Sequence, residues 1–201
     1  MSGDPHHPRV AAAARGELPP WSRATAGRRE HIERVAGLIE SWARTLGLDP
    51  AERVRWTAAA RLHDALRDAD PKELREELSG PEWTWPDPLL HGPAVAVRLR
   101  GEGVDDEALL LAIAYHTVGH PDFDTMGRAL YAADFLEPGR RVQEERRAAL
   151  RERMPHELDT VVLHVVRARL EHALEARRPI FSETAAFWSQ LLEVPGASDA
   201  G

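Results

Sequence analysis

The sequence contains no cysteine and no long apolar run. Without cysteine the protein can form no disulfide, no thiolate metal site and no cysteine nucleophile. No apolar segment reaches the roughly 18 residues that are needed to span a bilayer. The first 20 residues also lack the hydrophobic stretch of a signal peptide, because Arg9, Arg15 and Glu17 interrupt them. These absences predict a cytoplasmic protein that does not enter a membrane.

Positive charge is in the minority as well. The chain has 26 Lys and Arg against 33 Asp and Glu, which gives a formal net charge of −7. This balance argues against a broad nucleic-acid-binding face, because phosphate backbones attract clustered cations. A small polyphosphate ligand is still compatible with it, since such a ligand needs only a few local cations.

The length of 201 residues suits one domain with a substantial core. We expect residues 1–20 to form a mobile tail, because they are rich in Pro, Gly, Ala and Arg and show no apolar period. Residues 21–193 should form the domain, and residues 194–201 a second tail.

Between these tails nearly every segment has a helical pattern, and none alternates as a strand does. Apolar residues from Ile32 to Leu46 recur at steps of three and four, which places one stripe on a helix. Asp49-Pro50 and Asp70-Pro71 are helix-start signals, and the three prolines in residues 81–88 predict a loop. Further helices are expected over 89–101, from a cap at Asp105 to His116, over 124–136, along an apolar stripe from Leu163 to Leu174, and after a cap at Ser182. The pattern predicts an all-α fold.

Six residues of metal-ligating type lie at or near the ends of five of these helices. They are His31, His63, Asp64, His91, His116 and Asp134. A helical bundle can direct such side chains at one shared centre, and imidazole with carboxylate suits Fe, Mn, Co or Zn. A carboxylate such as Asp64 could bridge two ions. One histidine alone is more often structural, but the ordered series His, His-Asp, His, His, Asp is far more specific.

This series resembles the HD-domain superfamily of metal-dependent phosphohydrolases. Within it, the chain is similar to the YqeK-type family of bacterial symmetrical diadenosine tetraphosphate hydrolases. The matching segments are REHIERV, AARLHDALRD, LLHGPAVAV, AIAYHTVGHP and LYAADFLEPGR, and RPIFSETAAFW resembles the C-terminal helix of that family. The resemblance extends over residues 20–192, and HTVG followed by ADFLEPGR makes it more specific than a general HD match.

The resemblance implies an HD-domain helical bundle in which the six residues bind two divalent transition metals. Iron is the favoured metal, with Mn or Co as alternatives. The implied reaction is hydrolysis of diadenosine tetraphosphate to two ADP, with catalytic roles for Asp64 and Arg67. Asp68, which follows Arg67 in the chain, is a further catalytic candidate. Substrate contacts are implied at Arg67, Thr117, Gly119, His120 and Arg140. The chain departs from the family at Arg67, where Lys is usual, at Val118, where a small hydroxyl residue is common, and at His120, where Arg is common.

Several alternatives stay open at this point. Asp68 could move a proton or simply hold an ion pair, and His120 could contact phosphate or face solvent. Trp83 and Trp85 could stack on adenine or fix the proline-rich loop to the core. For the whole protein, the rivals are a phosphohydrolase of nucleoside mono-, di- or triphosphates, a di-iron HD-type oxygenase, and a non-catalytic nucleotide-binding module. We expect a small-molecule nucleotide partner, no nucleic-acid or membrane partner, and leave a homodimer open.

His156, His164 and His172 form a second histidine series, spaced every eight residues. They lie among Arg and Glu, which is typical of a solvated helix face and argues against a second metal site.

Overall fold

The computed structural model describes residues 6–193, and within that range it consists of helices and connecting loops with no strand. The all-α prediction is therefore confirmed for the described part of the chain. The expected C-terminal tail, residues 194–201, lies outside the described residues. The α-helices are α1 (Pro8–Ala14), α2 (Ala26–Thr45), α3 (Pro50–Leu62), α4 (Pro71–Glu77), α5 (His91–Gly101), α6 (Glu107–Tyr115), α7 (Thr125–Leu136), α8 (Glu144–Arg153), α9 (Leu158–Glu175) and α10 (Ser182–Leu192).

The Asp-Pro signals start helices as the sequence predicts. The side chain of Asp49 accepts a 2.9 Å hydrogen bond from the Glu52 backbone N–H at the start of α3. Asp70 accepts from Lys72 at the start of α4 in the same way. These bonds satisfy donors that the first helical turn leaves free.

Two predicted caps need correction. The cap of α6 is Asp106 and not Asp105, because the Asp106 carboxylate accepts a 3.0 Å bond from the Leu109 backbone N–H. Asp106 is held there by Arg55, which reaches across from α3. Ser182 is the first residue of α10, and the preceding Phe181 occupies the cap position without a side-chain hydrogen bond.

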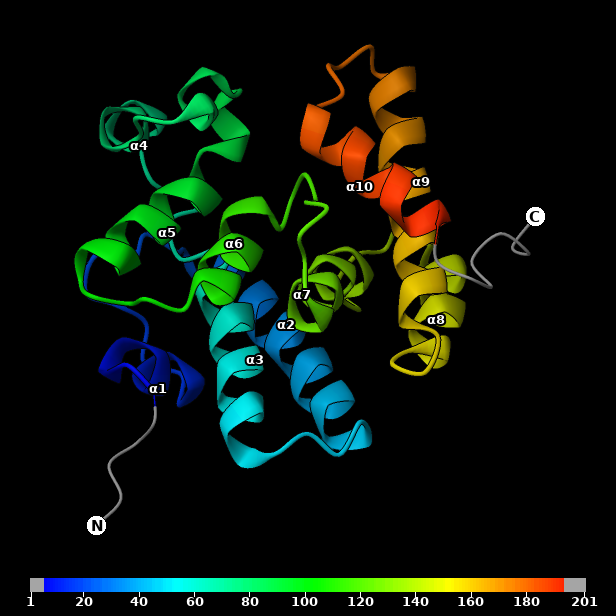
Figure 1. The fold of residues 1–201 in the computed structure, drawn as a ribbon, viewed down its shortest axis with the longest axis horizontal. Helices are drawn as coiled ribbons and strands as arrows, with labels where there is room; N and C mark the ends of the chain where they lie inside the picture. Colours follow the sequence, from blue (N-terminus) through cyan, green and yellow to red (C-terminus); the bar gives the residue numbers. More distant parts are fainter. Residues whose placement is uncertain (1–5, 194–201) are drawn as a thin grey trace.

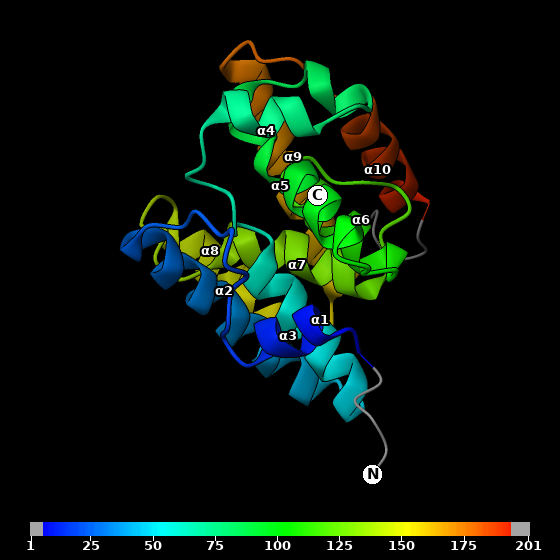
Figure 2. The same ribbon diagram turned by 90° about the vertical axis from the view of Figure 1, so that its left-hand side faces the viewer.

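Within the mobile tail expected over residues 1–20, the structure differs at residues 8–14, and residues 1–5 lie outside the described part of the chain. Residues 8–14 form α1, with Pro8 in its first turn and His7 as its cap. Val10 and Ala13 are buried in the core, and α1 packs across α3 (Figure 2). Packing against a neighbouring helix therefore stabilises a segment that is too short to show a clear apolar period.

Helix α7 lies in the middle of the bundle (Figure 1). It packs against α2, α3 and α6 on one side and against α8 and α9 on the other, while α10 covers α9. Because α7 contacts helices from both halves of the chain, a polar residue on it can meet partners that are far apart in the sequence. None of the described helices is both long and apolar enough to cross a membrane.

The proline-rich loop forms two short 3-10 helices, η1 (Pro81–Thr84) and η2 (Asp87–Leu89). Trp85 between them is buried, and its ring packs against Tyr115 and Phe181 at centroid distances of 5.5 and 5.3 Å. Trp83 is half exposed, with the Arg75 guanidinium over its ring. Trp85 thus fixes the loop to the core.

Candidate metal centre

All six residues of the predicted series are buried, and they meet where several helices end. His31 comes from α2, His63 ends α3 and Asp64 follows it. The others come from the start of α5, the end of α6 and the last turn of α7, as His91, His116 and Asp134. Each of the six residues has at most 6% of its surface exposed to solvent. The ends of α3 and α6 and the start of α5 therefore meet at this cluster.

Asp64 lies at the middle of the cluster. Its Oδ1 is 3.0 Å from Nε2 of His91 and 3.6 Å from Nε2 of His116. Its Oδ2 is 3.5 Å from Nε2 of His31 and 3.6 Å from Nε2 of His63. The cluster therefore contains two groups with metal-ligand geometry, His31-His63-Asp64 and Asp64-His91-His116, which share Asp64. One carboxylate oxygen is available to each group, which is the arrangement of a bridging ligand.

Backbone carbonyls fix the orientation of three imidazoles. The Nδ1–H groups of His63, His91 and His116 donate to the carbonyls of Ala60, Pro88 and Ile113, at 2.6, 3.0 and 2.8 Å. Since a carbonyl can only accept, each of these rings carries its proton on Nδ1 and directs the Nε2 lone pair into the cluster. Metal-binding histidines are commonly held in this way.

Two ring nitrogens in the cluster lack any hydrogen-bond partner among the described residues. They are Nε2 of His31 and Nε2 of His63, and both are buried. A buried polar atom without a partner is costly, and a metal ion would satisfy both. The donor set, four imidazoles with carboxylates and no thiolate, fits divalent metal ions.

Asp134 lies outside both groups but beside His31, whose Nε2 is 3.3 Å from Oδ1 of Asp134. Two guanidinium groups also engage this carboxylate. Arg140 donates to Oδ1 at 2.8 Å, and Arg169 of α9 donates to Oδ2 at 2.9 Å. Glu137, one turn further, approaches Nδ1 of His31 at 3.3 Å and accepts from Arg34 at 2.6 Å. Glu137 thus orients His31 in the role that carbonyls play for the other rings.

The charges of the cluster are strongly coupled. Burial raises the pKa of Asp64. The positive charge of His63 in its protonated form, and the hydrogen bonds that His116 and His91 donate once their Nε2 atoms are protonated, outweigh burial and hold that pKa well below its usual value. Burial is also the main reason why the pKa of His63 is lowered to about 4. At neutral pH the cluster therefore presents an ionised carboxylate and a neutral His63, the forms in which these groups bind metal.

Sequence reasoning missed Arg28 and Arg169. Arg28 lies three residues before His31 on α2, and its Nη1 donates to Oδ2 of Asp64 at 2.7 Å. Its position on the same helix face as His31 is a signal that the sequence does carry. Arg169 has no comparable local signal, because it joins the centre only through the packing of α9 on α7.

Thr117 and Arg140, two of the predicted substrate residues, line the same cavity. Thr117 follows His116, and Arg140 follows α7. Gly119 has φ +83°, a backbone conformation that favours glycine, and a Cβ there would lie 2.6 Å from the Phe187 ring. The fold therefore requires glycine at this position. His120 packs its ring against Tyr115 at 4.7 Å. Substrate contact by these residues stays a prediction.

Arg67 and Asp68 lie just after the His-Asp pair. Arg67 is half-buried and close enough to His91 for its charge to lower that pKa, although burial is the larger cause. The exposed Asp68 carboxylate accepts from both the backbone N–H and the hydroxyl of Thr25, at 2.9 and 2.8 Å. These bonds tie the start of α2 to the segment after α3, so Asp68 positions Arg28 and His31. A catalytic role for either residue stays a prediction.

In the second histidine series, His156 and His172 are exposed, as the sequence predicts, while His164 is half-buried. Burial and nearby arginines lower the pKa of His164. No group with metal-ligand geometry includes any of the three among the described residues.

Comparison with known proteins gives several matches. The chain is 29% identical over 170 residues to the symmetrical bis(5'-nucleosyl)-tetraphosphatase of Halalkalibacterium halodurans, covering 81% of this chain and 90% of that protein. The enzyme of that name from Bacillus subtilis is 28% identical over 63% of this chain and 70% of its own length. A crystal structure of a predicted HD superfamily hydrolase involved in NAD metabolism, from Clostridium acetobutylicum, aligns with a TM-score of 0.72 at 22% identity, over 91% of this chain and 95% of that one. It supports the fold.

The family model for the HD domain matches residues 28–162, the stretch that contains His31, His63, Asp64, His91, His116 and Asp134. By this match, and in agreement with the resemblance of its motifs, the chain belongs to the HD domain family.

Proposed function

We propose that this protein hydrolyses diadenosine tetraphosphate, and related dinucleoside polyphosphates, symmetrically to two nucleoside diphosphates. The observation that carries the proposal is the sharing of Asp64 by two ligand groups, one on each carboxylate oxygen. The relatives named symmetrical tetraphosphatases supply the substrate class. The protein would thus be an HD-type phosphohydrolase that acts on a small-molecule nucleotide partner.

Two divalent transition-metal ions would be held by the six buried residues, with Asp64 between them. We favour iron, with Mn or Co as alternatives, because imidazole and carboxylate ligands suit all three. When bound, such ions lower the pKa of a coordinated water and offset charge on phosphoryl oxygens. The cytoplasmic location stays a prediction, and a homodimer stays open.

Arginines near the cluster can stabilise the negative charge that develops during the reaction. In the proposed reaction, water adds to a β-phosphorus, the bond to the bridging oxygen breaks, and one ADP leaves with that oxygen. Negative charge grows on the oxygens around the phosphorus as this happens. Arg28 and Arg140 lie against the carboxylates of Asp64 and Asp134, where their charges can also stabilise those oxygens. Arg67, beside His91, is a third candidate.

A nucleotide screen with product analysis tests the proposal. Protein of measured metal content is incubated with diadenosine tetraphosphate in ¹⁸O-labelled water, and early time points are separated by chromatography. We expect ADP as the sole primary product, with one labelled β-phosphate per turnover. ATP plus AMP would overturn the symmetrical reaction. Faster hydrolysis of a mononucleotide, or a reaction that requires oxygen, would favour one of the two rival HD activities.

A further inference from the structure

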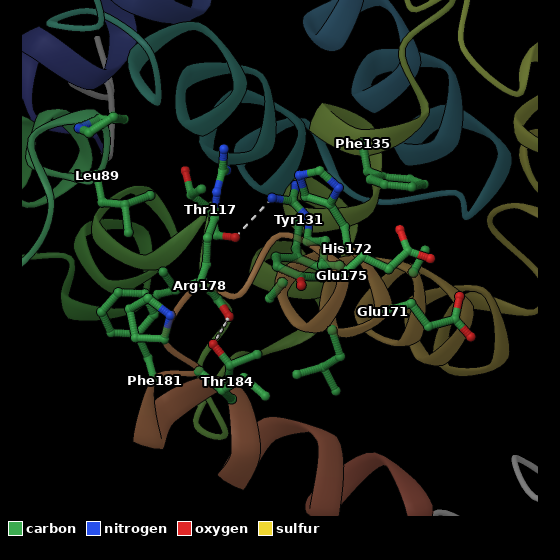
Figure 3. A pocket seen from close by; sticks show the side chains of 18 of the residues that line it. Leu89, Thr117, Tyr131, Phe135, Glu171, His172, Glu175, Arg178, Phe181 and Thr184 are labelled. Carbon is green, nitrogen blue, oxygen red and sulfur yellow. Dashed lines mark hydrogen bonds between the residues drawn. The ribbon is translucent and has the colours of Figure 1, made fainter.

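A cavity of about 810 Å³ adjoins the candidate metal centre on the side of Asp134. Helices α7, α8, α9 and α10 and the segment around η2 enclose it. Leu89 and Phe181 lie on one side, and Tyr131, Phe135 and His172 on the other (Figure 3). Its volume is within the range of small-molecule binding sites. Arg140 and Arg169, which both contact Asp134, line it, so the cavity and the centre share a wall.

The charge of this cavity is opposite to that of the whole chain. Five arginines line it, Arg140, Arg146, Arg147, Arg169 and Arg178, while Glu171 and Glu175 are its only acidic lining residues within the described part of the chain. The chain as a whole has a net charge of −7. A local excess of cations in an acidic protein is the signature of a site for an anion.

Arg169 is the cation that connects the cavity with the metal centre. Its Nη2 donates to Oδ2 of Asp134 at 2.9 Å, and its Nη1 donates to the Thr117 carbonyl at 2.8 Å. The guanidinium also lies over the rings of Tyr131 and Phe135, at 4.7 and 5.6 Å from their centroids. Two directed bonds and two ring faces hold it in one orientation, which only the planar fork of an arginine allows.

Arg169 belongs to a part of the chain that the HD domain match does not reach. That match ends at residue 162, whereas Arg169 lies in the second half of α9. The C-terminal helices therefore bring a cation to the centre from outside the stretch that the HD domain model matches. These helices also form much of the cavity wall, so they provide both Arg169 and the cavity that it lines.

Two donors beside the cavity have no partner among the described residues. They are Nε of Arg169 and the hydroxyl of Tyr131, and both side chains line the cavity. Burial raises the pKa of Tyr131 to about 12, so its hydroxyl keeps its proton at neutral pH and stays available as a donor. Unsatisfied buried donors are uncommon in a folded protein, and at a cavity wall they favour an acceptor-rich ligand.

We propose that this cavity binds the nucleoside diphosphate half of the substrate that leaves, and that Arg169 positions its phosphates against the Asp134 end of the centre. This inference rests on the proposed function and adds the site of one half of the substrate. The phosphates would lie along Arg140 and Arg169. The base would lie further out, near the ring of Phe181, on which it could stack.

Binding of ADP to the metal-loaded protein tests this without turnover. Isothermal titration compares the wild type with Arg169→Gln, Arg169→Lys and the control Arg44→Gln. Arg44 lies on α2, is exposed and does not line the cavity. We expect the Kd for ADP to rise at least about tenfold in both Arg169 variants and to stay unchanged in the control. Adenosine, which lacks phosphate, should bind the Arg169 variants and the wild type alike.

A second variant covers the case in which Arg169→Gln releases metal. Arg178 is exposed at the cavity and makes no contact with Asp134, so Arg178→Gln should weaken ADP binding at unchanged metal content. ADP binding that is unaffected by Arg178→Gln and by either Arg169 variant would overturn the proposal. If ADP binding depends on Arg169 but diadenosine tetraphosphate is not cleaved, the cavity assignment holds and the proposed function fails. If cleavage is symmetrical but ADP binding is independent of Arg169, the proposed function holds and the cavity assignment fails.

Discussion

Arg28 and Asp64 form an ion pair at the middle of the candidate metal centre. Nη1 of Arg28 is 2.7 Å from Oδ2 of Asp64, the oxygen that faces His31 and His63. The side chain of Asp64 is almost fully buried, whereas that of Arg28 keeps 26% of its exposed surface. A positive group at this position offsets the charge of the buried carboxylate, and part of the Arg28 side chain stays accessible to solvent.

Arg28→Gln should therefore separate metal binding from turnover. A guanidinium on Oδ2 competes with a cation for that oxygen, so we expect the variant to bind Mn²⁺ as tightly as the wild type or more tightly. Hydrolysis of diadenosine tetraphosphate should fall by about 10- to 100-fold, because the variant lacks a cation that can stabilise the phosphoryl oxygens. Metal titration and steady-state kinetics measure the two effects. Arg29→Gln is the matched control, because Arg29 is exposed and bonds only the Ala24 carbonyl. Loss of metal in Arg28→Gln would contradict this interpretation.

Asp64→Asn should remove both metal binding and activity. The substitution keeps the shape of the side chain but removes the charge that both ligand groups share. We expect bound metal after dialysis to fall well below the wild-type content, and turnover to fall by on the order of 100-fold or more. Elemental analysis and kinetics check this, with circular dichroism to establish that the variant folds. Asp122→Asn is the control, since the Asp122 side chain is 80% exposed. Equal metal content in the two variants would refute the bridging role.

Much of the fold could be predicted because its signals are local. Asp49-Pro50 and Asp70-Pro71 determine helix starts through bonds within one turn, and these needed no tertiary information. The cap of α6 could not be chosen in this way, because Asp105 and Asp106 are chemically alike and Arg55 from α3 holds the second of them. Helix α1 was missed for the same reason. Val10 and Ala13 matter through their packing on α3, and the local pattern alone is weak.

The same difference between local signals and tertiary packing applies to the candidate site. The ordered histidines and aspartates are chemically distinctive, and the structure brings all six together, as the sequence predicted. The arginines that engage them were mostly missed, since Arg28 and Arg169 are two of 26 Lys and Arg residues in the chain. Their role depends on where a long side chain ends, and Arg169 reaches Asp134 across 35 residues of sequence. Glu137 was missed because its partner His31 lies on another helix.

The metal-free protein should lose stability as the pH falls from about 6.5 to about 4. Burial lowers the pKa of His63 from 6.5 to about 4, and burial lowers the pKa of His91 as well. In this window the unfolded chain binds protons that the folded chain does not, so acid favours unfolding. For His63 alone the change in the free energy of unfolding is about 3 kcal/mol. His31 opposes it, because Asp134 and Asp64 outweigh burial and raise its pKa.

Urea unfolding of chelator-treated protein at pH 7 and pH 5 measures this dependence. The His63→Gln variant should show a smaller difference between the two pH values, since it lacks the main titrating group. His156→Gln, which changes an exposed histidine, should behave as the wild type does. Unfolding midpoints that are equal at both pH values in the wild type would show that the centre is protonated without cost.

Arg140→Gln should lower turnover while leaving the metal content unchanged. Arg140 donates to the Asp134 carbonyl at 3.0 Å and to Oδ1 at 2.8 Å, but Arg169 also holds that carboxylate through Oδ2. Asp134 should therefore keep its position and its ionised state without Arg140, since its pKa is well below its usual value despite burial, through His31 and two arginines. The variant loses a cation on the cavity wall, since 41% of the Arg140 side chain is exposed there and can meet an incoming anion.

For Arg140→Gln we expect KM to rise and kcat to fall, together by roughly 10- to 100-fold in kcat/KM. Arg141→Gln, at the exposed neighbouring position, should match the wild type. If Arg140→Gln instead loses metal in proportion to activity, Arg140 serves to hold Asp134 and not to bind the substrate.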